Sequence, residues 1–312
     1  MVRLLITAGV LGYLTYVLHR RESHLTDLYQ QWRGNGATGQ YGRLALLIPL
    51  GLLNWSLEAL KWQLLARKIA HIRWNEAFQG VLAGLALGFV TPNTLGDYAA
   101  RLWMLDQRNR LEAVGAVMLG RVAQLYSTLL VGLLALVYFA RVQLPARPEL
   151  AIAAIALCAI LLLAGVGVAL NRRFVRLLPR FRVTRPLARY LRVLETYRPA
   201  EVFAIAGLSL LRYGVFSGQF FLLLRIFGIS LPPLDAFTGI ALVYLAKSVV
   251  PALHFLSDLG VREVSALYIF DFYHAAPAAV LAATLSLWLL NMLLPALSGS
   301  FLLWRLKIGP HS

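Results

Sequence analysis

Residues 150–170 read LAIAAIALCAILLLAGVGVAL, a run of 21 residues without a charged side chain. A helix needs about 20 mostly apolar residues to cross the hydrocarbon layer of a bilayer. Lipid offers no water to open backbone groups, so a run of this kind is expected to be helical. It also lacks the alternating pattern of a membrane barrel strand. The stretch therefore predicts a transmembrane α-helix.

Further apolar runs of similar length predict five more spans on both sides of this one. The run closest to the N-terminus resembles a signal peptide, but no small-x-small cleavage site follows it. We therefore expect an uncleaved first span. With 150–170 the expected fold is an all-α polytopic membrane protein of six transmembrane helices, whose other spans are 2–18, 44–65, 112–140, 201–227 and 277–304.

The composition excludes an ordinary soluble domain and makes several partners implausible. Of 312 residues, 59% are hydrophobic and 14% are charged, whereas soluble domains carry about 25% charged residues. The net charge of +16 comes mainly from Arg placed between apolar runs, which indicates membrane topology rather than nucleic-acid binding. Cys158 is the only cysteine and lies inside an apolar run, so no disulfide or cysteine metal site is expected.

Two apolar stretches, 77–106 and 235–272, are each interrupted by Pro and Gly with charged residues nearby. Each offers two apolar arms of about a dozen residues, which is too short for two full crossings. Backbone that is not helical is tolerated at membrane depth only where protein or a polar cavity covers it. We therefore expect two re-entrant hairpins of broken helices.

The positive-inside rule orients the chain. Segment 171–198 carries nine Arg and one acid, Glu195, and is expected to be a cytoplasmic connector. If each broken stretch enters and leaves on one face, both termini are also cytoplasmic. The single transmembrane domain, 1–312, then divides into two inverted repeats, 1–140 and 150–305.

Weak self-similarity agrees with an inverted repeat. The motif WQLLAR begins at Trp62, and a similar FFLLLR begins at Phe220, which is 158 residues later. Pro92 and Pro251 are 159 residues apart. Interrupted helices at matching places in two inverted halves indicate a transporter binding site near the membrane midplane. Chance similarity between apolar helices is the alternative interpretation.

Ionisable residues inside apolar spans are costly and need a partner or a function. Glu58 and Lys61 lie three residues apart, so they share a helix face and can neutralise each other. Arg121 and Arg212 lack a local partner in the sequence. We expect each of these two arginines to face a polar cavity or a carboxylate from another helix.

The two broken stretches contain the remaining candidate residues. Asp97 and Arg101 are four apart in the first, where Asn93 or Thr94 is a candidate helix cap. In the second, Ser257 or Asp258 is a candidate cap, and the charged candidates are Lys247, His254, Arg262 and Glu263. Helix N-termini and Arg bind phosphate well, so an anion site is predicted. A rigid turn closed by these residues is the alternative.

The order Gly88-Phe-Val-Thr-Pro followed by Gly96-Asp97-x-x-x-Arg101, with Leu-Gly-Val-Arg262-Glu263 after Pro251, resembles the lysylphosphatidylglycerol synthase transmembrane-region family, also called flippase-like proteins. The resemblance covers roughly 40–305, with Asp97 where the family usually has Glu. It implies a lipid translocator of a bacterial inner membrane. The namesake also has a soluble aminoacyltransferase domain; we expect none here, because the sequence ends at Ser312.

The sequence thus predicts a translocator that binds the anionic headgroup of a phospholipid or lipid-linked phosphate between the two hairpins. The expected substrate-binding residues are Arg101, Arg262, Lys247, Arg212, Asp97, Glu263 and Glu58. No cofactor, metal or catalytic residue is expected. The alternatives are a membrane enzyme acting on a lipid-linked phosphate or sugar through Asp97, Glu263 or His254, and a lipid-binding scaffold. A homo-oligomer and a separate lipid-modifying enzyme stay open as partners.

Overall fold

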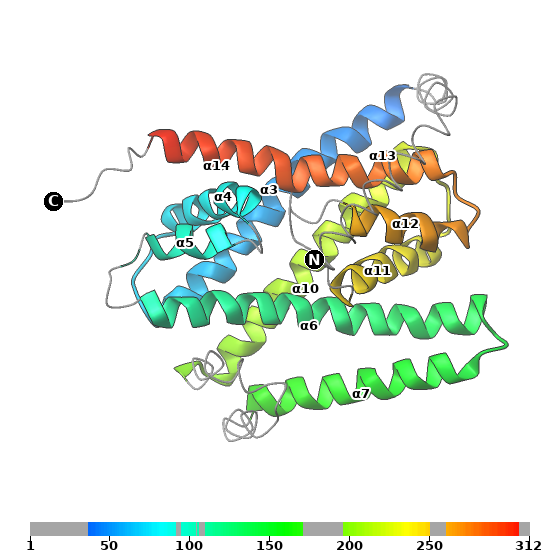
Figure 1. Cartoon of the computed structure of the whole chain (residues 1–312), viewed down its shortest axis with the longest axis horizontal. Coiled ribbons are helices and arrows are strands. Elements are labelled where there is room, and N and C mark those ends of the chain that lie inside the picture. The colour runs from blue at the N-terminus through cyan, green and yellow to red at the C-terminus, as the bar shows by residue number, and fades with distance from the viewer. Residues whose placement is uncertain are drawn as a thin grey trace, which may run out of the picture. The chain divides into compact units, whose positions relative to one another are not determined.

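The computed structural model describes residues 37–91, 95–103, 105, 110–170, 196–249 and 260–305. Every regular element among these residues is helical, as expected for a chain in lipid. The α-helices, labelled in Figure 1, are α3 (Ala37–Ala66), α4 (Trp74–Val90), α5 (Leu95–Trp103), α6 (Arg110–Gln143), α7 (Pro148–Leu170), α10 (Pro199–Ile226), α11 (Pro233–Val249), α12 (Val261–Asp271), α13 (Pro277–Trp288) and α14 (Leu294–Arg305). A π-helical turn, η5 (Leu289–Leu293), joins α13 to α14.

Five helices of the described part of the chain are long and apolar enough to cross a membrane. These candidate spans are Tyr41–Ala66, Glu112–Gln143, Pro148–Gly167, Pro199–Ile226 and Pro277–Trp304. They coincide with five of the six predicted spans and make the chain a multi-pass membrane protein. The remaining predicted span, 2–18, lies outside the described residues.

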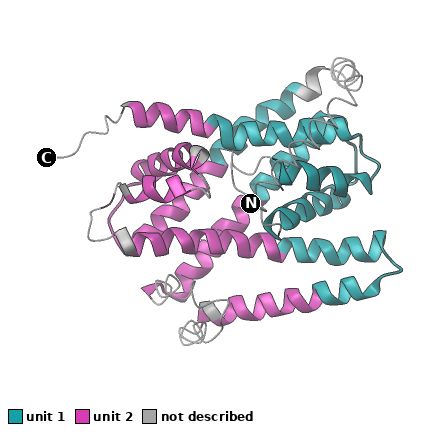
Figure 2. Ribbon diagram, viewed as in Figure 1, with its two compact units in different colours: residues 1–53, 131–154, 214–294 teal, residues 54–130, 155–213, 295–312 magenta. Residues whose placement is uncertain are grey.

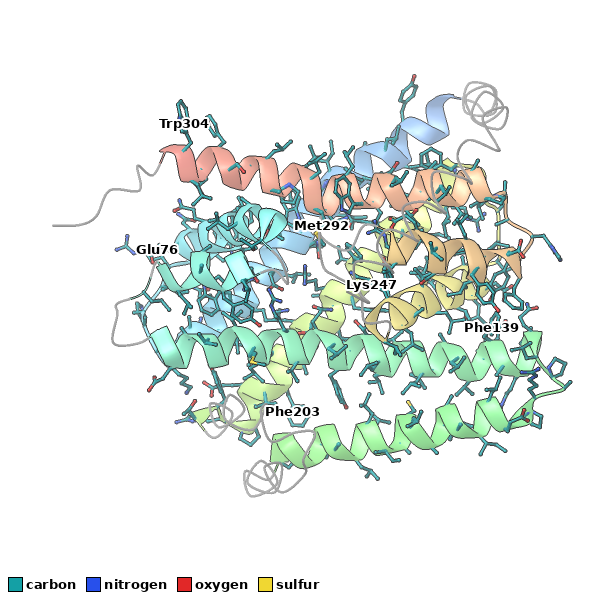
Figure 3. All side chains as sticks on the ribbon, viewed as in Figure 1. Glu76, Phe139, Phe203, Lys247, Met292 and Trp304 are labelled. Atoms are coloured by element: carbon teal, nitrogen blue, oxygen red, sulfur yellow. The ribbon has the colours of Figure 1, made fainter. Side chains whose placement is uncertain are left out.

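Large apolar side chains on these helices face outward, which is the arrangement that lipid favours. On α7, Ile152, Ile160 and Leu163 are all more than 60% exposed. Trp304, near the end of α14 in Figure 3, is 79% exposed. In water such surfaces would be a liability, whereas hydrocarbon solvates them.

Both broken stretches form pairs of helices that pack against each other. α5 runs back along α4, so that Gly96 lies against Leu87 and Gly84 lies against Asp97. The second pair is α11 with α12, in which Gly239 lies against the ring of Phe270. The predicted interruption of each stretch is confirmed. Whether the pairs re-enter the membrane stays a prediction, and Pro92, Asn93, Thr94, Pro251, His254, Ser257 and Asp258 lie outside the described residues.

The chain divides into two compact units, drawn in different colours in Figure 2. The described part of unit 1 comprises residues 37–53, 131–154, 214–249 and 260–294. Unit 2 comprises the described residues within 54–130, 155–213 and 295–305. Each unit contains the end of one long helix, one broken pair and the start of the next long helix. The repeats 1–140 and 150–305 stay a prediction, and most of the 171–198 connector lies outside the described residues.

The core of unit 2 surrounds the end of α3. Trp62 and Leu65 are buried there against the first turns of α4 and α6, with Tyr197 just before α10. The Tyr197 hydroxyl donates to the Leu65 carbonyl, which ties the start of α10 to α3. Gly299 of α14 lies directly against the backbone of Leu82 in α4. Small residues let membrane helices approach closely, because dispersion forces depend on short separations.

The core of unit 1 is aromatic. Phe220 of α10 is fully buried, and its ring lies 6.2 Å from that of Tyr244 and 6.1 Å from that of Phe270. These three rings join α10 to both helices of the second broken pair. Each pair is therefore anchored to a long helix within its own unit.

Candidate functional site

The candidate site begins on α3, in unit 2, with a carboxylate and an amine on one face. Lys61 Nζ lies 2.7 Å from Glu58 Oε2, as the three-residue spacing predicts. Both side chains are buried: 3% of Lys61 and 13% of Glu58 is exposed. A buried charge is costly unless it is paired, so this ion pair is the starting point of the site.

Helix α5 adds a second ion pair that connects to the first. Arg101 Nε donates to Asp97 Oδ1 at 2.8 Å, as predicted from their four-residue spacing. Arg101 NH2 reaches across to Glu58 Oε1 at 3.0 Å. The guanidinium also lies over the ring of Trp62, 5.6 Å from its centroid. Arg101 thus links the first broken pair to α3.

Two arginines from long helices complete the set. Arg121 of α6 donates from NH2 to Asp97 Oδ2 at 2.8 Å, and its guanidinium lies 4.5 Å from the Tyr98 ring centroid. Arg212 of α10 places NH1 3.1 Å from Glu58 Oε2. Of the two alternatives predicted for these arginines, a polar cavity or a carboxylate from another helix, the structure shows a carboxylate for both. We call Glu58, Lys61, Asp97, Arg101, Arg121 and Arg212 the charged cluster.

Two neutral amides hold the cations of the charged cluster in place. Arg212 Nε donates to Asn54 Oδ1 at 3.0 Å. Gln124 Oε1 accepts from Lys61 Nζ and from Arg212 NH1, each at 3.4 Å. Gln124 Nε2 donates to the Ser209 carbonyl at 3.2 Å, which fixes the amide with its oxygen toward the cations. These amides position Arg212 without neutralising it.

The charged cluster carries more positive than negative charge around Glu58. The two carboxylates Glu58 and Asp97 are shared by Lys61, Arg101 and Arg212 even when Arg121 is left aside. Among the described residues, these five side chains therefore carry one net positive charge. Glu58 Oε2 lies 2.7 Å from Lys61 Nζ and 3.1 Å from Arg212 NH1, so two cations share this oxygen. The surplus charge favours an additional anion.

Exposure decides from which side an anion can reach the charged cluster. Lys61 and Arg101 are 3% and 7% exposed, whereas Arg212 is 25% and Arg121 is 40% exposed. Arg121 and Arg212 are therefore the accessible residues of the charged cluster, and Lys61 is its most deeply buried cation.

Glycines allow the first broken pair to place Asp97. A Cβ on Gly84 would collide with Asp97 Oδ1, and a Cβ on Gly96 would collide with the Leu87 carbonyl. Thr91 caps the start of α5 by accepting from the Gly96 amide at 2.8 Å. Asn93 and Thr94, the predicted caps, lie outside the described residues. Close backbone approach at these two glycines thus sets the position of the Asp97 carboxylate.

The other predicted site residues lie in unit 1. Arg262 NH2 pairs with Glu263 Oε1 at 2.6 Å, and Glu263 Oε2 accepts from the Gly260 amide at 2.6 Å. Gly260 has φ of 109°, a conformation that L side chains rarely adopt. This geometry closes the first turn of α12. Lys247 lies in the last turn of α11 (Figure 3), where a cation suits the helix dipole.

The structure therefore brings four predicted site residues together, Glu58, Asp97, Arg101 and Arg212. Arg262 and Glu263 form a separate buried pair. Arg101 and Arg262 belong to different units, so their joint action on one headgroup stays a prediction. Sequence reasoning missed Asn54 and Gln124, because neutral amides in an apolar span give no charge signal. Among the described residues no group of three or more His, Cys, Asp or Glu could hold a metal ion.

Comparison with known proteins assigns this helical architecture to a family. The family model for the lysylphosphatidylglycerol synthase TM region matches residues 1–299. The chain belongs to this family. The resemblance seen in its sequence motifs is thus confirmed, and family membership links this multi-pass membrane protein to lipid metabolism or transport. Searches of curated proteins and of solved structures gave no significant match.

Proposed function

We propose that this family member binds the anionic headgroup of a phospholipid or lipid-linked phosphate at the charged cluster and moves that lipid between leaflets. One observation carries the proposal: among the described residues, Lys61, Arg101 and Arg212 share the two carboxylates Glu58 and Asp97, so these five side chains carry one net positive charge. Ionisable residues at such a depth mark substrate pathways more often than structural pairs. The setting we infer is a bacterial inner membrane, with both termini cytoplasmic.

The chemistry of the cations favours a phosphate group. Arg presents a planar fork of N–H donors that matches two phosphate oxygens. The hydrogen-bond acceptors of Arg212, Asn54 and Gln124, are neutral, and its one carboxylate contact among the described residues, Glu58 at 3.1 Å, is shared with Lys61 and Arg101. The acyl or prenyl tails would remain in lipid while the headgroup contacts the charged cluster.

The proposal gives four members of the charged cluster a role. Arg212 and Arg101 bind the phosphate, and Asp97 positions Arg101 through its 2.8 Å ion pair. Glu58 keeps the cations together while no ligand is bound.

The proposal also includes three residues of unit 1 that the sequence predicts to bind substrate, Lys247, Arg262 and Glu263. Arg262 and Lys247 contribute positive charge to headgroup binding, and Glu263 positions Arg262 through their 2.6 Å contact. Arg262→Lys keeps the charge and loses the planar fork. If Arg101 and Arg262 act on one headgroup, the double Lys variant exchanges lipid no more slowly than the slower single variant, because residues acting as a unit are not additive.

Lipid exchange in proteoliposomes tests the proposed function. The labelled lipids are phosphatidylglycerol and phosphatidic acid, with phosphatidylcholine as the neutral comparison. Parent protein is expected to accelerate exchange of the anionic lipids over protein-free vesicles. Arg212→Lys should slow that exchange about tenfold, since the fork is lost while the charge stays.

Arg225→Lys is the matched control, since Arg225 lies on the same helix and donates to the Leu231 carbonyl at 2.6 Å. It should keep the parental exchange rate. Lipid exchange separates a translocator from a scaffold that binds lipid without exchange, and lipid retention during purification, measured by mass spectrometry, shows whether the protein binds lipid at all. The proposal fails if folded parent protein neither retains nor exchanges anionic lipid, or if folded Arg212→Lys exchanges it at the parental rate.

A further inference from the structure

Glu58 occupies the position in the charged cluster that an incoming anion would need. Its Oε1 lies 3.0 Å from Arg101 NH2, and its Oε2 lies 2.7 Å from Lys61 Nζ and 3.1 Å from Arg212 NH1. A phosphate group uses the same kind of contact, with two oxygens spread over cationic donors. The carboxylate therefore fills the centre of the site in the structure described here.

The contacts of Glu58 differ in how well they are formed. Oε1 accepts a hydrogen bond of ordinary geometry from Arg101. Oε2 lies at hydrogen-bond distance from Lys61 Nζ, 2.7 Å, whereas Arg212 NH1 lies 3.1 Å away and the Arg212 guanidinium directs its hydrogen bonds to Asn54 and Gln124. Glu58 therefore interacts with Arg212 by charge attraction without a directed hydrogen bond, and another anion can replace the Glu58 carboxylate at Arg212.

The cations would stay in place if Glu58 moved away. Arg212 keeps its hydrogen bonds to Asn54 and Gln124, and Lys61 keeps its contact with Gln124. Arg101 keeps Asp97 as its ion-pair partner at 2.8 Å. A prearranged set of donors with an exchangeable internal anion is the expected design of a site that must bind and release.

From these contacts we infer that Glu58 is an internal competitor for the headgroup phosphate, displaced first from Arg212 when lipid binds. This inference rests on the proposed function and adds the residue that sets the affinity of the site. Arg212 is the first to change partner because it is 25% exposed, whereas Lys61 is 3% exposed. Competition by Glu58 keeps lipid binding weak enough for release.

Glu58→Gln tests the competition directly, because the amide keeps the shape and removes the negative charge. The full chain is placed in nanodiscs of phosphatidylcholine. One arm adds phosphatidic acid to the nanodisc, and the other adds inorganic phosphate to the buffer. Binding is read from the thermal shift and, for the lipid arm, from native mass spectrometry. Glu201→Gln is the control, since Glu201 pairs with Lys68 at 2.9 Å, away from the charged cluster.

Without ligand, Glu58→Gln should melt at a lower temperature than Glu201→Gln, because three cations, two of them buried, lose a counter-ion. Phosphatidic acid should then bind about tenfold more tightly to Glu58→Gln than to the parent, because no internal carboxylate competes with it. Glu201→Gln should keep parental affinity. Tighter binding in both arms supports recognition of the phosphate group alone, and tighter binding only in the lipid arm supports recognition of a lipid-borne phosphate.

Parental or weaker affinity of folded Glu58→Gln overturns the inference, provided that parent binding depends on Arg212. If neither protein binds phosphatidic acid in a manner that Arg212→Lys weakens, the proposed function itself has failed. Should Glu58→Gln not fold, Glu58→Asp serves instead. Its shorter side chain draws the carboxylate back, so affinity should rise by a smaller factor, and parental affinity in that variant also overturns the inference.

Discussion

Gly84→Ala tests whether close packing of the first broken pair positions the charged cluster. A methyl group at position 84 would collide with Asp97 Oδ1 and would lie 3.3 Å from Asp97 Cγ and 3.4 Å from Asp97 Cα. The carboxylate would have to move, and it holds Arg101 and Arg121 at 2.8 Å each. We expect the substitution to destabilise the protein and to slow lipid exchange.

The expected loss of stability in Gly84→Ala is the sum of opposing free-energy contributions. Replacing Gly by Ala inside a helix stabilises it by about 1 kcal/mol. Overpacking costs about 1–3 kcal/mol, and weakening a buried ion pair adds up to about 3 kcal/mol. The net loss is therefore about 2 kcal/mol, which corresponds to a decrease in melting temperature of roughly 5 °C.

Gly207→Ala is the matched control on α10 of the same unit, because a Cβ there meets nothing within 4 Å. It should melt at the parental temperature or higher. Both substitutions are then repeated in the Asp97→Ala background. There the Gly84→Ala methyl meets only the backbone of residue 97, so its cost should fall by about 1 kcal/mol or more.

Thermal unfolding in detergent and lipid exchange in proteoliposomes provide the two measurements. An equal cost of Gly84→Ala in both backgrounds would show that the Asp97 carboxylate is not what the methyl displaces. Melting of Gly84→Ala at the temperature of Gly207→Ala would refute the packing argument altogether.

Gln124→Glu adds a carboxylate beside Arg212, so the melting temperature should rise and phosphatidic acid should bind about tenfold more weakly. A lower melting temperature together with unchanged affinity for phosphatidic acid would contradict this. Burial, with the nearby charge of Asp235, raises the pKa of Tyr273 to about 12 from its usual 10. The folded state therefore favours the neutral phenol, and stability should fall as pH rises from 10 to 12. Tyr273→Phe should reduce that loss in pH-dependent melting curves. A cysteine introduced at Ser312 should resist impermeant thiol reagents added to intact cells, and strong labelling would refute cytoplasmic termini.

The features predictable from the sequence are those that depend on neighbouring residues. Apolar runs of helical length predicted six spans, and five of them coincide with candidate spans of the described residues, because burying apolar side chains in lipid requires little more than length. Glu58 with Lys61, and Asp97 with Arg101, follow from the helical repeat. Each of these predictions depends either on one continuous run of residues or on a pair of residues at most four positions apart.

Tertiary packing decided the rest. The partner of Arg212 is Glu58, far away in the chain, and no local pattern identifies which carboxylate an arginine reaches. Arg262 pairs with the adjacent Glu263, although adjacent residues in a helix do not face each other. The reason is local geometry: Glu263 folds back to the Gly260 amide, and that places its other oxygen near Arg262.

The neutral amides Asn54 and Gln124 indicate a binding site more strongly than the charged residues do. A carboxylate at position 124 would neutralise Lys61 and Arg212 and would lower the cost of burying them. Gln124 instead supplies the same oxygen at 3.4 Å to both cations and leaves their charge in place. A site whose purpose was only to hold helices together would gain from that neutralisation. Retained charge beside a displaceable Glu58 is what a site for a transient anion requires.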